Sequence, residues 1–154
     1  MDYRILPVTE ALLPKLKDLE ALCFSVPWTL AMFEEELSSP HAAYFAAENP
    51  EGALLGYAGL QFVMDEGYVT NVAVHPAARR KGVGSALLRA LLAFCGEKGL
   101  SFLSLEVRES NGAARSLYQS FGFQAVGLRK NYYARPREDA LLMTKFMDDL
   151  SCQR

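Results

Sequence analysis

Apolar spacing in residues 3–40 predicts a short strand followed by two helices. Residues 3–8 are rich in types that favour strands. At intervals of three or four positions, the apolar face of a first helix is then formed by Leu12, Leu16, Leu19 and Cys23. Thr29 is a typical N-cap for a second helix, whose glutamates at 34–36 we expect largely outside the core, and Pro40 ends it.

Later in the chain, β-branched and aromatic runs alternate with helical spacing. The strands predicted from these runs are residues 42–47, 53–64, 68–74, 102–107, 123–128 and 140–146. One further helix follows Ser85 and ends near Gly96 to Gly99, and another begins at Asn111 and ends at Gly122. The pattern predicts one α/β domain, a mixed sheet of about seven strands flanked by about four helices. We expect this domain to span residues 1–148, with 149–154 as a C-terminal tail.

The strands that end at Val74 and Val107 are separated by one predicted helix. A strand, helix and strand in succession are joined by a right-handed crossover, so we expect these two strands to be parallel neighbours. Ligands of such sheets lie beyond the carboxyl ends of the strands, and candidate chemistry is expected there.

The segment Arg79–Ser85 lies between the first of these strands and its helix. Gly82 and Gly84 leave backbone N–H groups uncovered by a Cβ, and the helix N-terminus aims unpaired donors at the same point. Three consecutive cations, residues 79–81, surround this point, so the predicted guest is a di- or triphosphate group. A solvated basic turn is the alternative, and the spacing matches neither a P-loop nor the G-x-G-x-x-G fingerprint.

Composition narrows the class of protein. The 154 residues carry 16 basic and 18 acidic side chains, a net charge of −2, so no global basic field attracts nucleic acid or an anionic membrane. Cys23, Cys95 and Cys152 are odd in number and lack C-x-x-C spacing, which indicates reduced thiols and argues against a metal site. No apolar run approaches the ~20 residues of a membrane helix. We therefore expect a cytoplasmic protein that uses no metal.

Two side chains near the predicted ligand edge are candidates for chemistry. Glu106 alternates with Leu105 and Val107, so it lies on the opposite face of its strand. A carboxylate there is either a solvated surface group or a general base. Tyr118 lies beside the apolar stripe of its helix, and is either a core-edge aromatic or a phenol that protonates a leaving thiolate. Residue spacing alone leaves both alternatives open.

Several motifs resemble one enzyme family. The R-x-x-G-x-G spacing from Arg79 to Gly84 resembles the signature of the GCN5-related N-acetyltransferase (GNAT) superfamily. The L-E-V-R-x-S-N block that begins at Leu105, with the A-x-x-L-Y-x-x-x-G-F block from Ala114, more narrowly resembles bacterial ribosomal-protein-alanine N-acetyltransferases and their archaeal and eukaryotic relatives. Blocks P-W, N-V-A-V, N-Y-Y and E-D-A occur in the order of the same group, so the similarity spans nearly the whole chain.

This resemblance implies a GNAT fold, acetyl-CoA as acyl donor and direct transfer to an amine. It implies that Glu106 accepts the proton of the attacking amine and that Tyr118 protonates the departing sulfur. The cofactor-binding residues that it implies are Val72, Ala73, Val74, Arg79, Arg80, Lys81, Gly82, Val83, Gly84, Ser85 and Asn111. The strand residues would contact the pantetheine arm and thioester, and the glycine turn would hold the pyrophosphate.

The substrate implied by the resemblance is the N-terminal segment of a ribosomal protein that begins with alanine. At pH 7 roughly a tenth of α-amines but only about one lysine in a few thousand is neutral, so an α-amine is the easier nucleophile. Tyr132 and Tyr133, in a predicted Asn/Arg/Pro-rich loop, are expected to clasp the peptide, although one can pack inward. Trp28 either packs at a helix entry or lines the peptide groove, and Glu138 either receives a substrate cation or lies in solvent.

Two other functions remain open from the sequence. One is an acetyltransferase for small amines or lysine side chains. The other is a non-catalytic sensor of acyl-coenzyme A.

Overall fold

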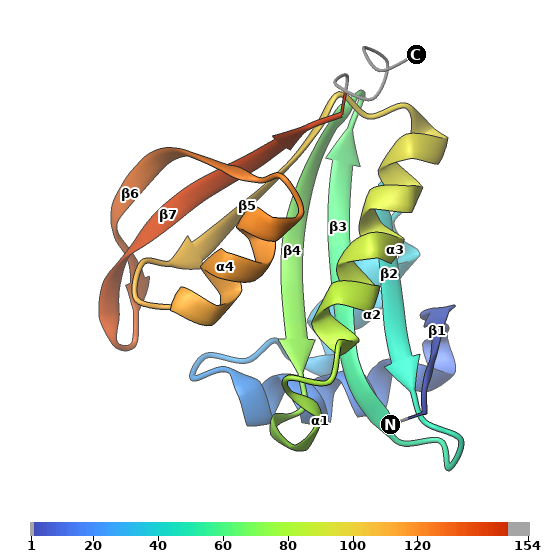
Figure 1. The fold of residues 1–154 in the computed structure, drawn as a ribbon. Helices are drawn as coiled ribbons and strands as arrows, with labels where there is room; N and C mark the ends of the chain where they lie inside the picture. Colours follow the sequence, from blue (N-terminus) through green and yellow to red (C-terminus); the bar gives the residue numbers. More distant parts are fainter. Residues whose placement is uncertain (1, 148–154) are drawn as a thin grey trace.

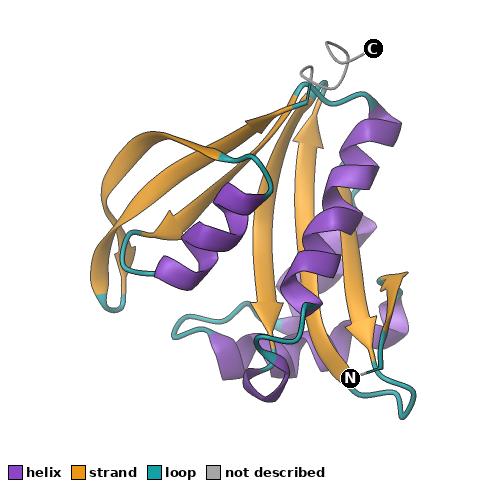
Figure 2. Cartoon of the chain, in the orientation of Figure 1, coloured by secondary structure: helices purple, strands orange, loops and turns teal. Residues whose placement is uncertain are grey.

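A computed structural model of the chain describes residues 2–147 and shows one twisted sheet with helices on both faces (Figure 1, Figure 2). The sheet has seven strands in the order β1-β2-β3-β4-β5-β7-β6. The predicted α/β architecture, a mixed sheet of about seven strands with four helices, is confirmed. The predicted tail and Cys152 lie outside the described residues.

The strands are β1 (Arg4–Pro7), β2 (Ala42–Glu48), β3 (Leu54–Val63), β4 (Glu66–Val74), β5 (Phe102–Arg108), β6 (Gln124–Ala134) and β7 (Arg137–Phe146). The helices are α1 (Leu13–Cys23), α2 (Leu30–Ser38), α3 (Val83–Lys98) and α4 (Gly112–Ser120), with one-turn 3-10 helices η1 (Glu10–Leu12) and η2 (Pro76–Ala78). Within residues 2–147 no helix combines the length and apolarity needed to span a bilayer.

Two hydrophobic cores lie on opposite faces of the sheet. Helices α1 and α2 cover β2, β3 and β4, and their core includes Leu16 and Phe33 packed around Tyr57. Helices α3 and α4 lie on the other face, where Leu87 and Leu103 belong to the larger core. Strands β5, β7 and β6 therefore have helical cover mainly on the α4 side.

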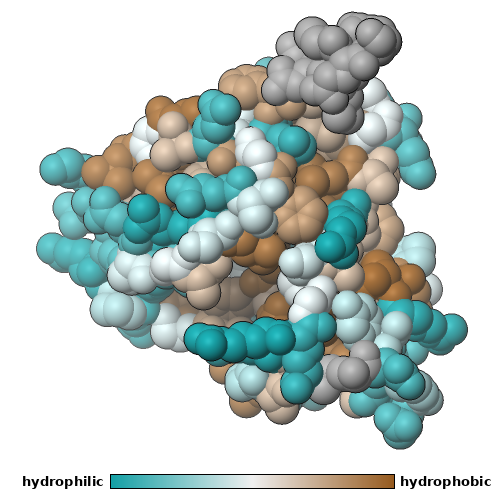
Figure 3. All heavy atoms as spheres, viewed as in Figure 1, coloured by the Kyte–Doolittle hydropathy of each residue, from teal (hydrophilic) through white to brown (hydrophobic). Residues whose placement is uncertain are grey.

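Strands β4 and β5 are parallel neighbours, as the sequence predicts, but they pair only where they begin. The register joins Glu66 to Phe102, Gly67 to Leu103 and Tyr68 to Ser104, and no further pair follows. Each strand stays with its other neighbour, β4 with β3 and β5 with β7, so the two diverge toward their carboxyl ends (Figure 1). Figure 3 shows the surface hollowed over this separation, between α4 and the turn before α3.

The C-terminal hairpin differs from the prediction. The sequence predicts a loop around Tyr132 and Tyr133, but β6 continues to Ala134 and pairs with β7 beyond a register shift between Arg129 and Tyr133. Asn131 lies at this bulge with a φ of 55°, a conformation that asparagine tolerates better than most residues. The bulge accommodates the residues between Arg129 and Tyr133 without ending the strand, so Tyr132 and Tyr133 both lie in β6.

The second helix begins at the predicted N-cap, but one glutamate of its predicted polar face is buried. Thr29 is the N-cap of α2, and its side chain accepts a hydrogen bond from the Met32 N–H. Glu36, expected outside, is buried and accepts hydrogen bonds from the Tyr44 hydroxyl and the Gln61 amide. The prediction fails because these polar partners lie on β2 and β3, which no helical pattern can reveal.

Candidate active site

The turn before α3 leaves the N-terminus of that helix open. Gly82 is its N-cap, with a φ of 83° that lies in the region favouring glycine, and the Tyr3 hydroxyl donates a hydrogen bond to the Gly82 carbonyl. The first N–H groups of a helix lack intrahelical partners, and Arg80 and Lys81 are exposed beside them. This arrangement suits the predicted pyrophosphate site, which stays a prediction.

Arg79 lies against the end of β4. Its Nε donates a hydrogen bond of 3.2 Å to the carbonyl of Val74, and its Nη2 lies 3.9 Å from the Sγ of Cys23. The side chain thus ties the turn to β4 and to α1. Other N–H groups of the guanidinium remain for the phosphate contact that the motif implies, and this contact stays a prediction.

The last residues of β4 have one backbone edge that no strand pairs, although Arg79 already donates to the Val74 carbonyl. Val72, Ala73 and Val74 pair with β3 on one side, while β5 has already diverged on the other. Alternate N–H and C=O groups of a strand point to opposite edges, so those on the β5 side face the separation. Such groups can bind an extended ligand as a neighbouring strand would.

Glu106 lies on the face of β5 that no helix covers. Leu103, Leu105 and Val107 are buried on the other face, as the predicted alternation requires. The Glu106 Oε2 lies 2.7 Å from Nε of Arg129, which reaches over β7 from β6. The Glu106 side chain is 26% exposed, so its carboxylate is neither fully solvated nor enclosed.

Tyr118 is more buried than its place beside the apolar stripe predicts. Its ring is 7% exposed and packs against Phe123, with ring centroids 5.7 Å apart. Burial, with a smaller effect of Tyr133, raises the pKa of Tyr118 to about 12. The raised pKa keeps this hydroxyl protonated at neutral pH, and no side-chain hydrogen bond of it is found within residues 2–147.

Tyr132 and Tyr133 lie close to each other and to Glu106. Their ring centroids lie 5.0 Å apart at an interplanar angle of 85°. Burial raises the pKa of Tyr133 to about 12, with Tyr132 and the nearby Glu106 adding to the shift. Arg129 lies 2.7 Å from Glu106 and 5.7 Å from the centroid of the Tyr132 ring, so the structure brings Glu106 and the two tyrosines together.

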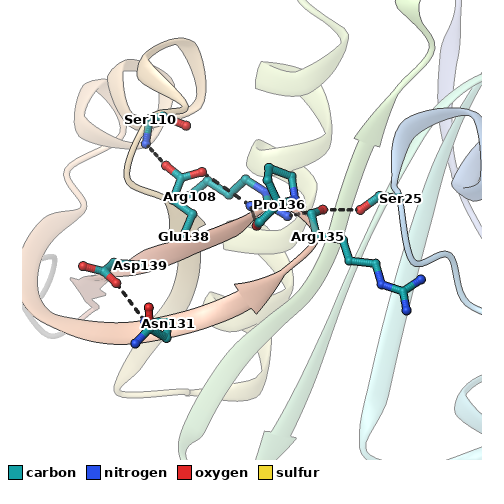
Figure 4. A network of polar contacts seen from close by, with 8 residues as sticks. All are labelled: Ser25, Arg108, Ser110, Asn131, Arg135, Pro136, Glu138 and Asp139. Atoms are coloured by element: carbon teal, nitrogen blue, oxygen red, sulfur yellow. Dashed lines mark hydrogen bonds and ion pairs between the residues drawn. The ribbon is translucent and has the colours of Figure 1, made fainter.

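Arg108 anchors the tip of the β6–β7 hairpin (Figure 4). One guanidinium nitrogen donates a hydrogen bond of 2.8 Å to the carbonyl of Pro136, and the other donates one of 3.0 Å to the carbonyl of Arg135. The same group lies 3.4 Å from Glu138 Oε1 and 4.2 Å from the centroid of the Tyr133 ring. Arg108 therefore fixes the strand that carries both tyrosines, a role that the sequence does not reveal.

The hairpin is also tied to the elements on either side of it (Figure 4). The Ser110 N–H donates a hydrogen bond of 2.6 Å to the second carboxylate oxygen of Glu138, and the Asn131 N–H donates one to the Asp139 carboxylate. Ser25 lies between α1 and α2, and its hydroxyl donates a hydrogen bond of 2.5 Å to the Arg135 carbonyl. Hydrogen bonds from Ser110, with a smaller effect of Arg108, lower the pKa of Glu138, so this carboxylate already has partners within the protein, and its predicted role toward a substrate cation stays a prediction.

A buried glutamate holds the segment between α1 and α2. Glu20 is 2% exposed and accepts hydrogen bonds from the Tyr57 hydroxyl, the Asn71 amide and the Trp28 N–H. The Trp28 ring packs on Phe33 with centroids 5.3 Å apart. The sequence does not reveal this role of Glu20, because a polar residue on an amphipathic helix normally faces solvent.

Two further predictions concern ligands. Asn111 is the N-cap of α4 and accepts a hydrogen bond of 3.1 Å from the Ala114 N–H, so its predicted contact with the cofactor stays a prediction. Among the described residues no three His, Cys, Asp or Glu side chains are grouped as a metal would require.

A mixed sheet that opens between two parallel strands, with a glycine turn and helix N-terminus beside the opening, defines a class of acyltransferases. The chain belongs to the acetyltransferase (GNAT) family, whose model matches residues 13–123. It is therefore an acyltransferase, and the predicted family is confirmed.

Similar proteins narrow the group. A protein of Mycobacterium tuberculosis named N-alpha-acetyltransferase RimI is 41% identical over 94% of this chain and 92% of its own length. The [ribosomal protein bS18]-alanine N-acetyltransferase of Escherichia coli K12 is 36% identical over 85% of this chain and 88% of its own. The crystal structure of the E. coli ribosomal-protein-S18-alanine N-acetyltransferase superposes with a TM-score of 0.87 at 33% identity, covering 94% of both chains.

Proposed function

We propose that this enzyme transfers acetyl from acetyl-CoA to the N-terminal α-amine of a ribosomal protein that begins with alanine. The names and full-length similarity of its relatives support this substrate. The observation that carries the proposal is the grouping of Glu106, Tyr132 and Tyr133, on strands beside the separation of β4 and β5. We expect the reaction in the cytoplasm, where ribosomal proteins are made.

The residues at the separation fit acetyl-CoA. The open N–H groups after Gly82, with Arg80 and Lys81, would hold the pyrophosphate. The unpaired edge of β4 at Val72–Val74 would accept the pantetheine amides. The same backbone N–H groups would stabilise the negative charge that develops on the thioester oxygen.

Glu106 would act as the general base. A substrate α-ammonium has a pKa near 8, so it must lose a proton before its nitrogen attacks the thioester carbon. A carboxylate on the open face of β5 can take that proton directly or through one water. The nitrogen then forms a bond to the acetyl carbon, and the bond to sulfur breaks with its electrons remaining on sulfur.

Tyr118 would donate its hydroxyl proton toward that sulfur. Its raised pKa keeps the phenol protonated at every pH at which the enzyme works. No side-chain hydrogen bond of its hydroxyl is found within residues 2–147. A phenol of high pKa acts best as a hydrogen-bond donor to the developing thiolate, with solvent completing the protonation.

The peptide would bind between the β6–β7 hairpin and the segment joining α1 to α2. Tyr132 is 49% exposed and beside Glu106, so it can contact the first residues of the substrate. Trp28, held by Glu20, would border the other side. The hydrogen bond from Ser25 to Arg135 joins these two walls.

Mass spectrometry of peptide acetylation tests the proposal. The set contains peptides that differ only in the first residue, an alanine-first peptide with an internal lysine, and the same peptide with a blocked terminus. We expect acetylation at the terminus, fastest with alanine, and none on the blocked peptide. Acetylation of the internal lysine alone would contradict the proposed substrate and favour the lysine alternative, and acetylation of simple amines alone would favour the small-amine alternative.

A further inference from the structure

We propose that Arg129 is a positioning residue, a built-in cation that holds the Glu106 carboxylate until the substrate ammonium displaces it. The inference rests on the proposed function, because it takes Glu106 as the base and a protonated amine as the substrate. It assigns a role to a residue that no sequence motif singled out.

The geometry places a permanent cation where the substrate must bind. The Arg129 Nε lies 2.7 Å from Oε2 of Glu106, the distance of a charge-assisted hydrogen bond. An α-ammonium that delivers its proton to Glu106 has to approach the same carboxylate within hydrogen-bond distance. Arg129 takes Oε2 and leaves Oε1 open, so an ammonium that approaches the carboxylate meets a like charge beside it, and the two cations compete.

The exchange is easy because the pair is near the surface. The Arg129 side chain is 58% exposed, and an exposed ion pair favours its closed form only about two- to fivefold. Such a pair keeps the carboxylate turned toward the open face of β5 without sealing it. A buried arginine in the same place would block the base.

The displaced guanidinium has an alternative contact nearby, the Tyr132 ring. Its central carbon lies 5.7 Å from the centroid of the Tyr132 ring, within cation–π distance. Arg129 can therefore release Glu106 and remain on Tyr132. Its charge then stays beside the substrate, where it disfavours a peptide with a second positive charge close to the terminus.

This competition predicts that removing Arg129 lowers the KM for the peptide. Competition reduces apparent substrate affinity by the fraction of enzyme in which Glu106 is free. Removing the competitor in Arg129→Met should therefore lower the KM for an alanine-first peptide about three- to sixfold, with kcat unchanged. A merely structural role predicts the opposite, a higher KM or a lower kcat. Arg129→Lys keeps a cation and should return KM toward the wild-type value.

Lys130→Met is the matched control. Lys130 is exposed, adjacent, and forms no ion pair with another described residue, so its loss removes the same charge from the same strand. Steady-state kinetics of the four proteins with acetyl-CoA saturating give the first readout. A KM in Arg129→Met that equals or exceeds that of Lys130→Met would overturn the inference.

A second readout does not depend on turnover. In protein with ¹⁵N-labelled arginine, the Nε–H signal of Arg129, assigned by its absence in Arg129→Met, reports on the bond to Glu106. With coenzyme A present, an alanine-first peptide should shift it, and the matching peptide without the terminal amine should not. Equal responses to both peptides, or to neither, would refute displacement.

The two readouts separate this inference from the proposed substrate. If the enzyme acetylates only internal lysines, the N-terminal function fails, yet a lysine amine should still shift the Arg129 signal. If the terminus is acetylated while the signal stays fixed, the function stands and the role of Arg129 fails.

Discussion

Replacing Arg108 by methionine should weaken peptide binding while leaving acetyl-CoA binding intact. The polar and cation–π contacts of Arg108 within residues 2–147 are with the β6–β7 hairpin and not with the turn before α3. The hairpin carries Tyr132 and Tyr133, which would face the peptide. Loss of the guanidinium should therefore affect one substrate and not the other.

The size of the effect follows from the contacts. Two charge-assisted hydrogen bonds contribute about 1 kcal/mol each at this partial exposure, because water can replace them at the hairpin tip. The ion pair to Glu138 and the contact with the Tyr133 ring add about 0.5 kcal/mol each. The sum, about 3 kcal/mol, corresponds to roughly 100-fold in affinity, so the peptide KM should rise between about 10- and 100-fold.

Steady-state kinetics with each substrate varied in turn provide the assay. Arg108→Lys keeps the charge but cannot donate to two carbonyls at once, so it should fall between wild type and Arg108→Met. Arg137→Met is the control, because Arg137 lies on the same hairpin and is exposed. If Arg108→Met keeps its peptide KM within threefold of that control, the hairpin does not hold the peptide as proposed.

Three further changes test other parts of the structure. Tyr118→Phe should lower kcat about 100-fold with little change in peptide KM. Burial raises the pKa of Tyr118 to about 12, so the unfolded chain loses this proton near pH 10 and the folded protein only near pH 12. Between these values the wild type should therefore lose about 2–3 kcal/mol more unfolding free energy than Tyr118→Phe, in which Tyr133 still titrates; equal alkaline losses in urea titrations would contradict this. Gly59→Ala places a Cβ into the Tyr44 ring and should cost about 1–3 kcal/mol; an unchanged melting temperature would show that Tyr44 moves freely. Glu20→Leu leaves buried donors unpaired and should cost about 3 kcal/mol or more, whereas Glu20→Gln keeps an acceptor and should cost less; equal losses would show that the hydrogen bonds of Glu20 contribute little.

The sequence predicts those parts of the fold that depend on local pattern. The Thr29 cap and the alternation around Glu106 follow from residues near them in the chain, and both are confirmed. The parallel pairing of β4 and β5 follows from the handedness of crossovers. Their separation does not, because it depends on where β3 and β7 hold the two strands.

The remainder depends on partners distant in sequence. Glu20 and Glu36 look like solvent-facing helix positions until tyrosines on β2 and β3 supply hydrogen bonds. Arg129 meets Glu106 across an intervening strand, and the bulge at Asn131 decides that pairing. Local propensity does not predict these long-range contacts, so the environment of the candidate base could be known only from the three-dimensional structure.

Single-turnover acetylation by Glu106→Gln most directly tests the central claim, that this carboxylate deprotonates a chain terminus. The variant is mixed with acetyl-CoA and an alanine-first peptide, both at concentrations that saturate the wild type. The account predicts a rate about 100- to 10,000-fold lower, with acetyl-CoA affinity unchanged and recovery as the pH approaches that at which the α-amine is neutral. A rate within threefold of the wild type at pH 7 would contradict it.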